Sequence, residues 1–150
     1  MSCVHFTSDA QRRVWAATPL GLSNEDAALL HSSPPVTESK LRRLRLLAES
    51  PEPGIRQSVA SNPHTPADLV RALAQDPDAT VRAAVARAET TPPEVLQVLA
   101  ADPDVQVRCW AAVNRTTTAA VIGVLADDPA AEVRSLARWR RSVEAQPATV

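Results

Sequence analysis

Four arginines recur at a fixed interval of 26 residues, and their spacing is the feature of this sequence that most invites a chemical role: Arg56, Arg82, Arg108 and Arg134. Aspartates recur near them at the same interval: Asp76, Asp102 and Asp128. A guanidinium can donate two parallel hydrogen bonds to a carboxylate, and it can also bind the free carbonyls at helix ends. We therefore predict a structural Arg ladder, in which each of the four arginines bridges neighbouring repeats. The alternative is a row of cations along one face, suited to phosphate or to an acidic peptide.

Residues typical of catalytic or metal sites are scattered along the chain. His5, His31 and His64 show no metal-ligand spacing beyond the weak pair of Cys3 and His5. The three glycines are isolated, so the sequence has no phosphate-binding loop. Neither cysteine has a base nearby in the sequence, and Cys109 is interpreted as a small packed residue. We predict no catalytic residue, no cofactor and no metal, and a protein that is not an enzyme.

The elements that must position the Arg ladder follow the same period. Three further columns keep the 26-residue interval without a gap, one of leucine, one of β-branched residues and one of proline. Their members are Leu47, Leu73, Leu99 and Leu125; Ile55, Val81, Val107 and Val133; and Pro51, Pro77, Pro103 and Pro129. Self-similarity at a period of this length is the signature of a repeat architecture.

Each period contains two helix starts. Before the first helix, Asp76 is expected to cap the free amides, and Pro77 is expected to occupy the first helical position. Before the second helix, Thr91 and Glu94 have the spacing of a capping box. The buried side of that second helix is predicted to consist of Val95, Leu96, Val98 and Leu99. Helices of about ten residues are marginal alone in water, so the pairs must stack. We predict an all-α fold, a right-handed α-solenoid of short helix pairs with a 26-residue repeat.

The pattern divides the chain into three parts. Residues 1–40 are predicted to form degenerate N-terminal capping helices and a connector, and residues 41–145 the helical repeat array. Residues 146–150 are predicted to be a disordered tail. Trp139 falls near the end of the last helix of the array, where we expect it to cover the end of the core; a dimer contact is the alternative.

The unit resembles the variant leucine-rich repeat family, an α-solenoid relative of HEAT repeats. The residues that carry the resemblance are Leu73-Ala74-x-Asp76-Pro77-Asp78-x-x-Val81-Arg82-x-x-Val85-Ala86, followed by Thr91-Pro92-x-x-Val95-Leu96. The resemblance covers about two-thirds of the chain, and it implies an interaction surface rather than an activity. Some members of the family carry a cysteine-ligated iron–sulfur cluster before the array. Only Cys3 precedes the repeats here, so that cluster is not carried over.

Positions that differ between otherwise equivalent units are the best candidates for binding another protein. Trp110 stands out in its column, and Trp is enriched among interface hot spots; core packing is the equally natural interpretation. The candidate partner-binding residues are Trp110, Cys109, Arg71, Gln97, Ala120 and Gly123. We expect the smooth Ala120 and Gly123 region, beside Trp110, to be the docking patch.

The sequence therefore favours a non-catalytic protein–protein interaction scaffold or adaptor. The alternative is a nucleic-acid-binding HEAT-like protein with an Arg-lined face, although the net charge of −1 gives no overall attraction to nucleic acid. A weaker possibility is an accessory protein that positions a partner enzyme. Two cysteines form no disulfide framework, and no segment has the pattern of a signal peptide or is long enough to cross a bilayer. These features predict a cytoplasmic protein with no membrane partner.

Overall fold

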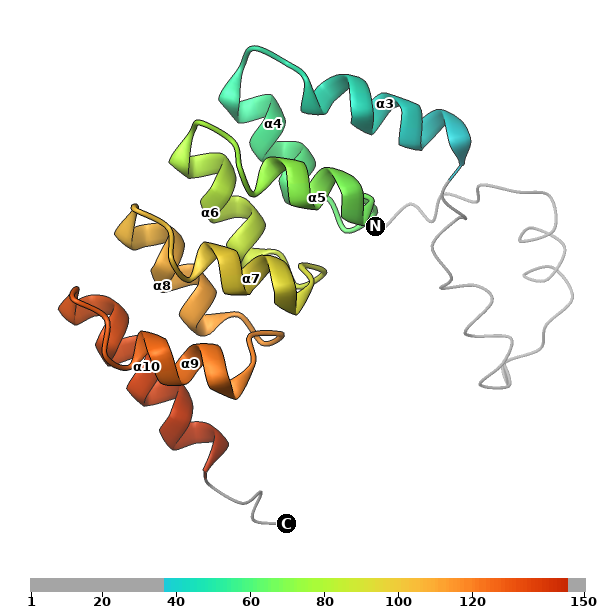
Figure 1. The fold of residues 1–150 in the computed structure, drawn as a ribbon. Coiled ribbons are helices and arrows are strands. Elements are labelled where there is room, and N and C mark those ends of the chain that lie inside the picture. The colour runs from blue at the N-terminus through green and yellow to red at the C-terminus, as the bar shows by residue number, and fades with distance from the viewer. Residues whose placement is uncertain (1–36, 146–150) are drawn as a thin grey trace, which may run out of the picture. The chain divides into compact units, whose positions relative to one another are not determined.

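The computed structural model describes residues 37–145, and these residues form helices and connecting turns without a strand (Figure 1). The helices are α3 (Glu38–Ala48), α4 (Pro53–Ala60), α5 (Ala67–Leu73), α6 (Ala79–Arg87), α7 (Pro93–Leu99), α8 (Val105–Val113), α9 (Ala119–Leu125) and α10 (Ala131–Glu144). The predicted helical solenoid is confirmed. The predicted capping helices before residue 37 and the predicted tail lie outside the described residues.

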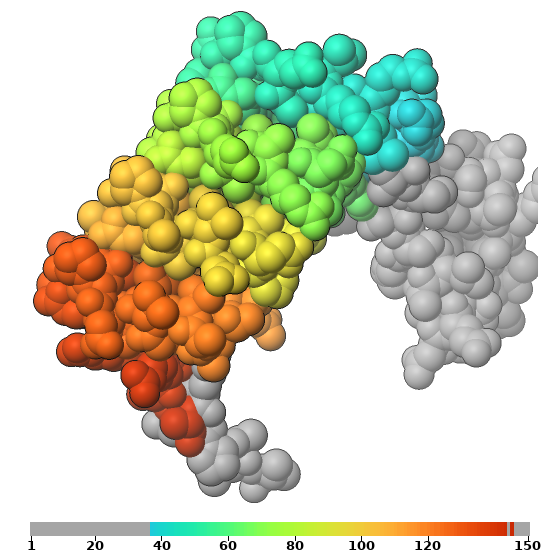
Figure 2. All heavy atoms as spheres, viewed as in Figure 1, coloured from blue at the N-terminus to red at the C-terminus, as the bar shows by residue number. Residues whose placement is uncertain are grey.

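The helices form two layers. The first helix of each pair belongs to one layer, α4, α6, α8 and α10, in which each helix packs directly on the next. The second helices, α3, α5, α7 and α9, form the other layer and contact mainly the first helices on either side of them. Figure 2 shows the pairs stacked as successive bands of atoms from α3 to α10. The first helices therefore hold the array together along its length.

Small and β-branched residues fill the space between the layers. In α6, Val81, Val85 and Ala86 are almost completely buried, and in α7 Leu96 and Leu99 are equally buried. Alanine and valine let neighbouring helices approach closely, which explains an interior with few large rings. Val98, which we expected on the buried side of α7, is 61% exposed, so that prediction is wrong. A helix of only two turns offers too few residues for the sequence to define its buried face.

The first helices start two residues later than predicted. α6 begins at Ala79, and its N-cap is Asp78, whose side chain accepts a hydrogen bond from the Thr80 amide. Asp76 and Pro77 therefore lie in the turn before the helix. The carboxylate of Asp76 instead accepts from the Asp78 amide and from Arg56. The prediction that Asp76 caps the helix was wrong because this carboxylate is engaged by the arginine.

The predicted capping box at Thr91 is also wrong. α7 begins at Pro93, with Pro92 as its N-cap and no side-chain capping bond. Thr91 is 1% exposed, and its hydroxyl donates to the carbonyl of Val85, at 2.6 Å. Thr65 and Thr117 make the same bond to the carbonyls six residues before them. The Val85 carbonyl also accepts from the Ala88 amide, so the buried threonine gives a carbonyl at the end of the helix its second hydrogen bond.

The last helix differs from the other first helices. α10 has 14 residues, whereas α6 and α8 have 9 each. Val133 and Ala137 close the core on this helix, with no exposed surface. Trp139 is 57% exposed, so the expectation that it covers the end of the core is wrong. No helix among residues 37–145 combines the length and apolar character that a membrane span requires.

Candidate interaction surfaces

The Arg ladder lies along the edge where the first helices begin. The Nε of Arg82 donates to one oxygen of Asp102 at 2.7 Å, and its Nη2 donates to the other at 2.9 Å. The Nη1 of the same guanidinium donates to the carbonyls of Asp76, at 2.8 Å, and Pro77, at 3.2 Å. Arg56 repeats this arrangement with Asp76, and Arg108 repeats it with Asp128. One guanidinium thus joins the turn before its own helix to the turn before the next first helix.

These bonds form a continuous chain from one pair of helices to the next. Asp76 accepts from Arg56 through its carboxylate and from Arg82 through its carbonyl, so each aspartate links two arginines. The side chains of the three paired arginines are 11–13% exposed, and those of their aspartates are 5–6% exposed. Three of the four cations are therefore used inside the fold and present little charge to a ligand.

The carboxylates of the ladder are held in their ionised form. The hydrogen bonds from Arg56 lower the pKa of Asp76, and those from Arg108 lower the pKa of Asp128. For Asp102 burial alone would raise the pKa, but the hydrogen bonds from Arg82 and from the Asp104 amide outweigh it and the pKa is lowered. The pKa values of Arg56, Arg82 and Arg108 are raised, first of all by the same bonds. Each pair is thus a charged, bidentate contact.

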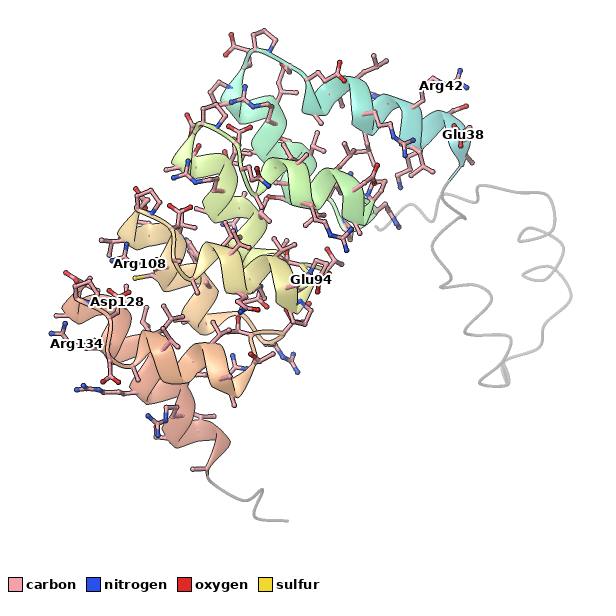
Figure 3. The ribbon with its side chains drawn as sticks, in the orientation of Figure 1. Glu38, Arg42, Glu94, Arg108, Asp128 and Arg134 are labelled. Carbon is pink, nitrogen blue, oxygen red and sulfur yellow. The ribbon has the colours of Figure 1, made fainter. Side chains whose placement is uncertain are left out.

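Arg134 has only half of this environment. Its Nη1 donates to the carbonyls of Asp128, at 2.7 Å, and Pro129, at 2.8 Å, as in the other three positions. No carboxylate of the described residues meets its Nε and Nη2. Figure 3 shows Arg108, Asp128 and Arg134 along the same edge of the array. Within residues 37–145, the ladder therefore ends on an arginine that is oriented by carbonyls but meets no carboxylate.

Trp110 lies on α8, in the layer of first helices. It is 37% exposed, and the guanidinium of Arg87 sits over its ring at 5.7 Å from the centroid, within the range of a cation–π contact. A shallow hollow of about 260 Å³ adjoins it, lined also by Gln57, Thr80 and Gln106. Cys109, its neighbour, is 9% exposed and packs in the core, and burial raises the pKa of its thiol. Trp110 can contact a ligand, whereas Cys109 is covered.

The other candidates lie on the second helices. Arg71 on α5 forms an exposed ion pair with Glu94 on α7, at 3.0 Å. Gln97 and Ala120 line a hollow of about 300 Å³ between α7 and α9. Gly123 lies on α9, where a Cβ would meet no atom within 4 Å. Trp110 lines a different hollow, with residues of α4 and α6, so the structure does not place it beside Ala120 and Gly123 as we had expected.

A row of exposed apolar residues at one position of the second helices was not predicted from the sequence. We call this row the apolar column, and its members are Leu46, Ala72, Val98 and Val124. Leu46 is 67% exposed, Val98 61% and Val124 72%. The 26-residue interval was visible in the sequence, but an apolar residue in a short helix is normally expected to be buried. The column became visible only when the structure showed which side of each helix faces water.

The two layers, the buried threonines and the ladder define a helical repeat solenoid. Comparison with known proteins finds that the leucine rich repeat variant family matches residues 53–78 and 79–104. The two matches begin at the first residues of α4 and α6. Residues 53–104 are therefore two tandem leucine rich repeat variant repeats, and the predicted resemblance is confirmed. No curated protein and no solved structure matches the chain.

Proposed function

We propose that this chain is a non-catalytic scaffold or adaptor for protein–protein interaction, and that a partner contacts the outward face of its second helices. The observation that carries the proposal is the apolar column, in which three aliphatic side chains are each more than 60% exposed. Exposed apolar side chains aligned at one position of successive helices form a candidate interaction surface, because apolar patches on soluble proteins mark interaction sites. Repeat arrays commonly use such an extended face for binding.

The hollow between α7 and α9 gives this face a place for an anchoring side chain. Its lining carries no charge: Gln97, Ala100, Ala101, Ala120, Val121 and Val124. An apolar residue inserted there would be desolvated on several sides, which is the usual setting of an interface hot spot. Towards α3 the same face changes character, because the exposed ion pairs Arg45–Asp68 and Arg71–Glu94 lie there. This change from charged to apolar side chains along the face favours one orientation of a bound partner.

Several observations support a non-catalytic role. The aspartates of the ladder hold arginines, and Cys109 is buried with a raised pKa, so these groups are poorly placed to act on a substrate. Within residues 37–145, no group of three or more His, Cys, Asp or Glu side chains could hold a metal. The nucleic-acid alternative needs arginines that converge on an open face, and three of the four ladder arginines are bound to carboxylates instead. We therefore propose the protein-interaction role alone.

The proposal can be tested by affinity capture with matched surface variants. The bait variant carries Val98→Asp and Val124→Asp, which places two charges on the apolar column. The control carries Val143→Asp, the same change at a 49% exposed valine of α10. A nuclease-treated sample runs in parallel, and circular dichroism checks that all baits are folded. We expect a stoichiometric protein partner on the wild type and on the control, and its loss from the double variant.

Two results would contradict the proposal. A partner that binds the double variant as well as the wild type would show that the apolar column is not the contact surface. Recovery of nucleic acid that salt removes, with no protein enriched, would favour the nucleic-acid alternative, since phosphate contacts weaken steeply as salt rises. Trp110→Ala adds a third bait, because this substitution removes the exposed ring of the other layer without touching the apolar column.

A further inference from the structure

Arg134 differs from the other ladder arginines, because half of its guanidinium meets no carboxylate of the described residues. The fold builds the same guanidinium setting four times, with Nη1 held by two carbonyls of the preceding turn. In three of the four, Nε and Nη2 point at an aspartate, at distances of 2.6–3.1 Å. At Arg134 the orienting bonds are present, at 2.7 and 2.8 Å, and no described carboxylate faces the other two nitrogens.

The internal positions show what kind of segment supplies the acid. Arg108 on α8 is paired with Asp128, which comes three residues after the end of α9. Arg82 on α6 is paired with Asp102, three residues after the end of α7. In each case the accepting carboxylate lies in the turn that follows a short second helix. The described residues contain no second helix after α10, so this half of the last unit is missing from them.

The face of α10 that a following second helix would cover is exposed. One period earlier, Cys109 and Ala112 on α8 pack in one cluster with residues of α9, and they are only 9% and 0% exposed. The equivalent residues of α10 are Ser135 and Arg138, and both are exposed. This face of α10 therefore carries a polar side chain and a cation, which are complementary to an acidic segment.

We propose that Arg134 is a docking point for a carboxylate of a partner protein, whose segment completes the last unit. The segment is a short helix followed within about three residues by an aspartate or glutamate, and it lies over Ser135 and Arg138. A carboxylate is favoured over a phosphate because the same setting holds a carboxylate at each of the three internal positions. The site lies on a different surface from the apolar column, so its test is independent of the test of the proposed function.

The test uses the full chain and a peptide copied from its own array. The probe is the blocked peptide of residues 91–105, which contains the α7 sequence and the turn with Asp102. NMR follows the Nε–Hε resonances of the arginine side chains while the peptide is added. We expect the Arg134 resonance to shift saturably while those of Arg56, Arg82 and Arg108, already paired, stay in place. A peptide with Asp102→Asn should bind about tenfold more weakly, because it loses the charged acceptor.

Two protein variants complete the test. Arg134→Lys keeps the charge but loses the planar two-nitrogen donor, so the peptide should bind about tenfold more weakly to it. Arg42→Lys, at an exposed position of α3, should bind the peptide like the wild type. Equal binding of the Asn peptide, or an Arg134 resonance that matches the paired arginines before peptide is added, would overturn the proposal. So would a thymidine oligonucleotide that shifts Arg134 more strongly than the peptide does.

Discussion

The edge of the array and the outward face of its second helices differ in how far their polar residues recur from unit to unit. Along the edge, Arg82 and its equivalents recur in every period, and three of the four form an ion pair with an aspartate. On the outward face, the column that contains Arg71 reads Arg45, Arg71, Gln97 and Gly123. A residue that must bond its equivalents in the next unit cannot change without breaking that bond, whereas one that faces water can change freely. Along the edge, recurrence thus reflects bonds within the fold, whereas the variation in the column of Arg71 reflects side chains that face water.

Acid should produce the largest effect, because it acts on three ladder pairs at once. The folded-state pKa values of Asp76, Asp102 and Asp128 are lowered, so their stabilisation is present above the unfolded-state pKa of about 3.9 and is lost as pH falls through the folded values. Denaturant unfolding at pH 7, 4 and 3 should show a steep fall in the free energy of unfolding. Asp102→Asn should remove about a third of that pH dependence. If Asp102→Asn kept the wild-type dependence of the free energy of unfolding on pH, Asp102 would not be one of the carboxylates that cause it. Asp68→Asn, which alters an exposed ion pair, serves as the control.

Breaking a single internal pair should come next. Arg82→Ala leaves Asp102 buried without its partner and should lower the free energy of unfolding by about 2–4 kcal/mol. Arg134→Ala removes the same side chain and the same two carbonyl bonds where no described acid is present, and should cost about 1 kcal/mol or less. Urea unfolding of the two variants measures the difference. Equal losses would show that the carbonyl bonds, and not the carboxylates, carry the ladder's stabilisation.

A smaller effect is expected at the buried threonines. Thr91→Val preserves the shape of the side chain but removes the donor to the Val85 carbonyl, which should cost about 1–3 kcal/mol. Thr90→Val, at the adjacent exposed position, should change stability by less than about 0.5 kcal/mol. Thermal unfolding of both variants gives the comparison. If the two substitutions had the same effect, Thr91 would have to be reinterpreted as a simple packing residue.

The smallest effect on stability is expected on the outward face. Val98→Asp and Val124→Asp replace side chains that face water, so each should change the free energy of unfolding by less than about 0.5 kcal/mol. The same substitutions are the ones expected to abolish partner binding. A loss of more than about 1 kcal/mol would place these valines in the fold and remove the contrast between the two regions.

The period, the helical class and the column of arginines could be predicted from the sequence, because each depends on residue types repeated at one interval. Which of Asp76 and Asp78 caps the helix could not be predicted from the sequence. Both acids have good capping positions, and the choice depends on Arg56, twenty residues earlier in the chain. The exposure of Val98 escaped prediction because its helix has only 7 residues. The separation of Trp110 from Ala120 escaped it because α8 and α9 belong to different layers, which linear spacing does not show.

The placement of each charge pair within its period bears on how such an array changes in length. Arg82 and Asp102 both lie within residues 79–104, and Arg56 and Asp76 both lie within residues 53–78. Duplicating or deleting one such segment as a whole would add or remove an arginine together with its own acid. Each arginine would still find two carbonyls in the turn before its helix, as Arg82 finds those of Asp76 and Pro77. The gene can therefore gain or lose a segment of this length and keep each buried aspartate paired, whereas an insertion of another length between an arginine and its acid would separate the pair.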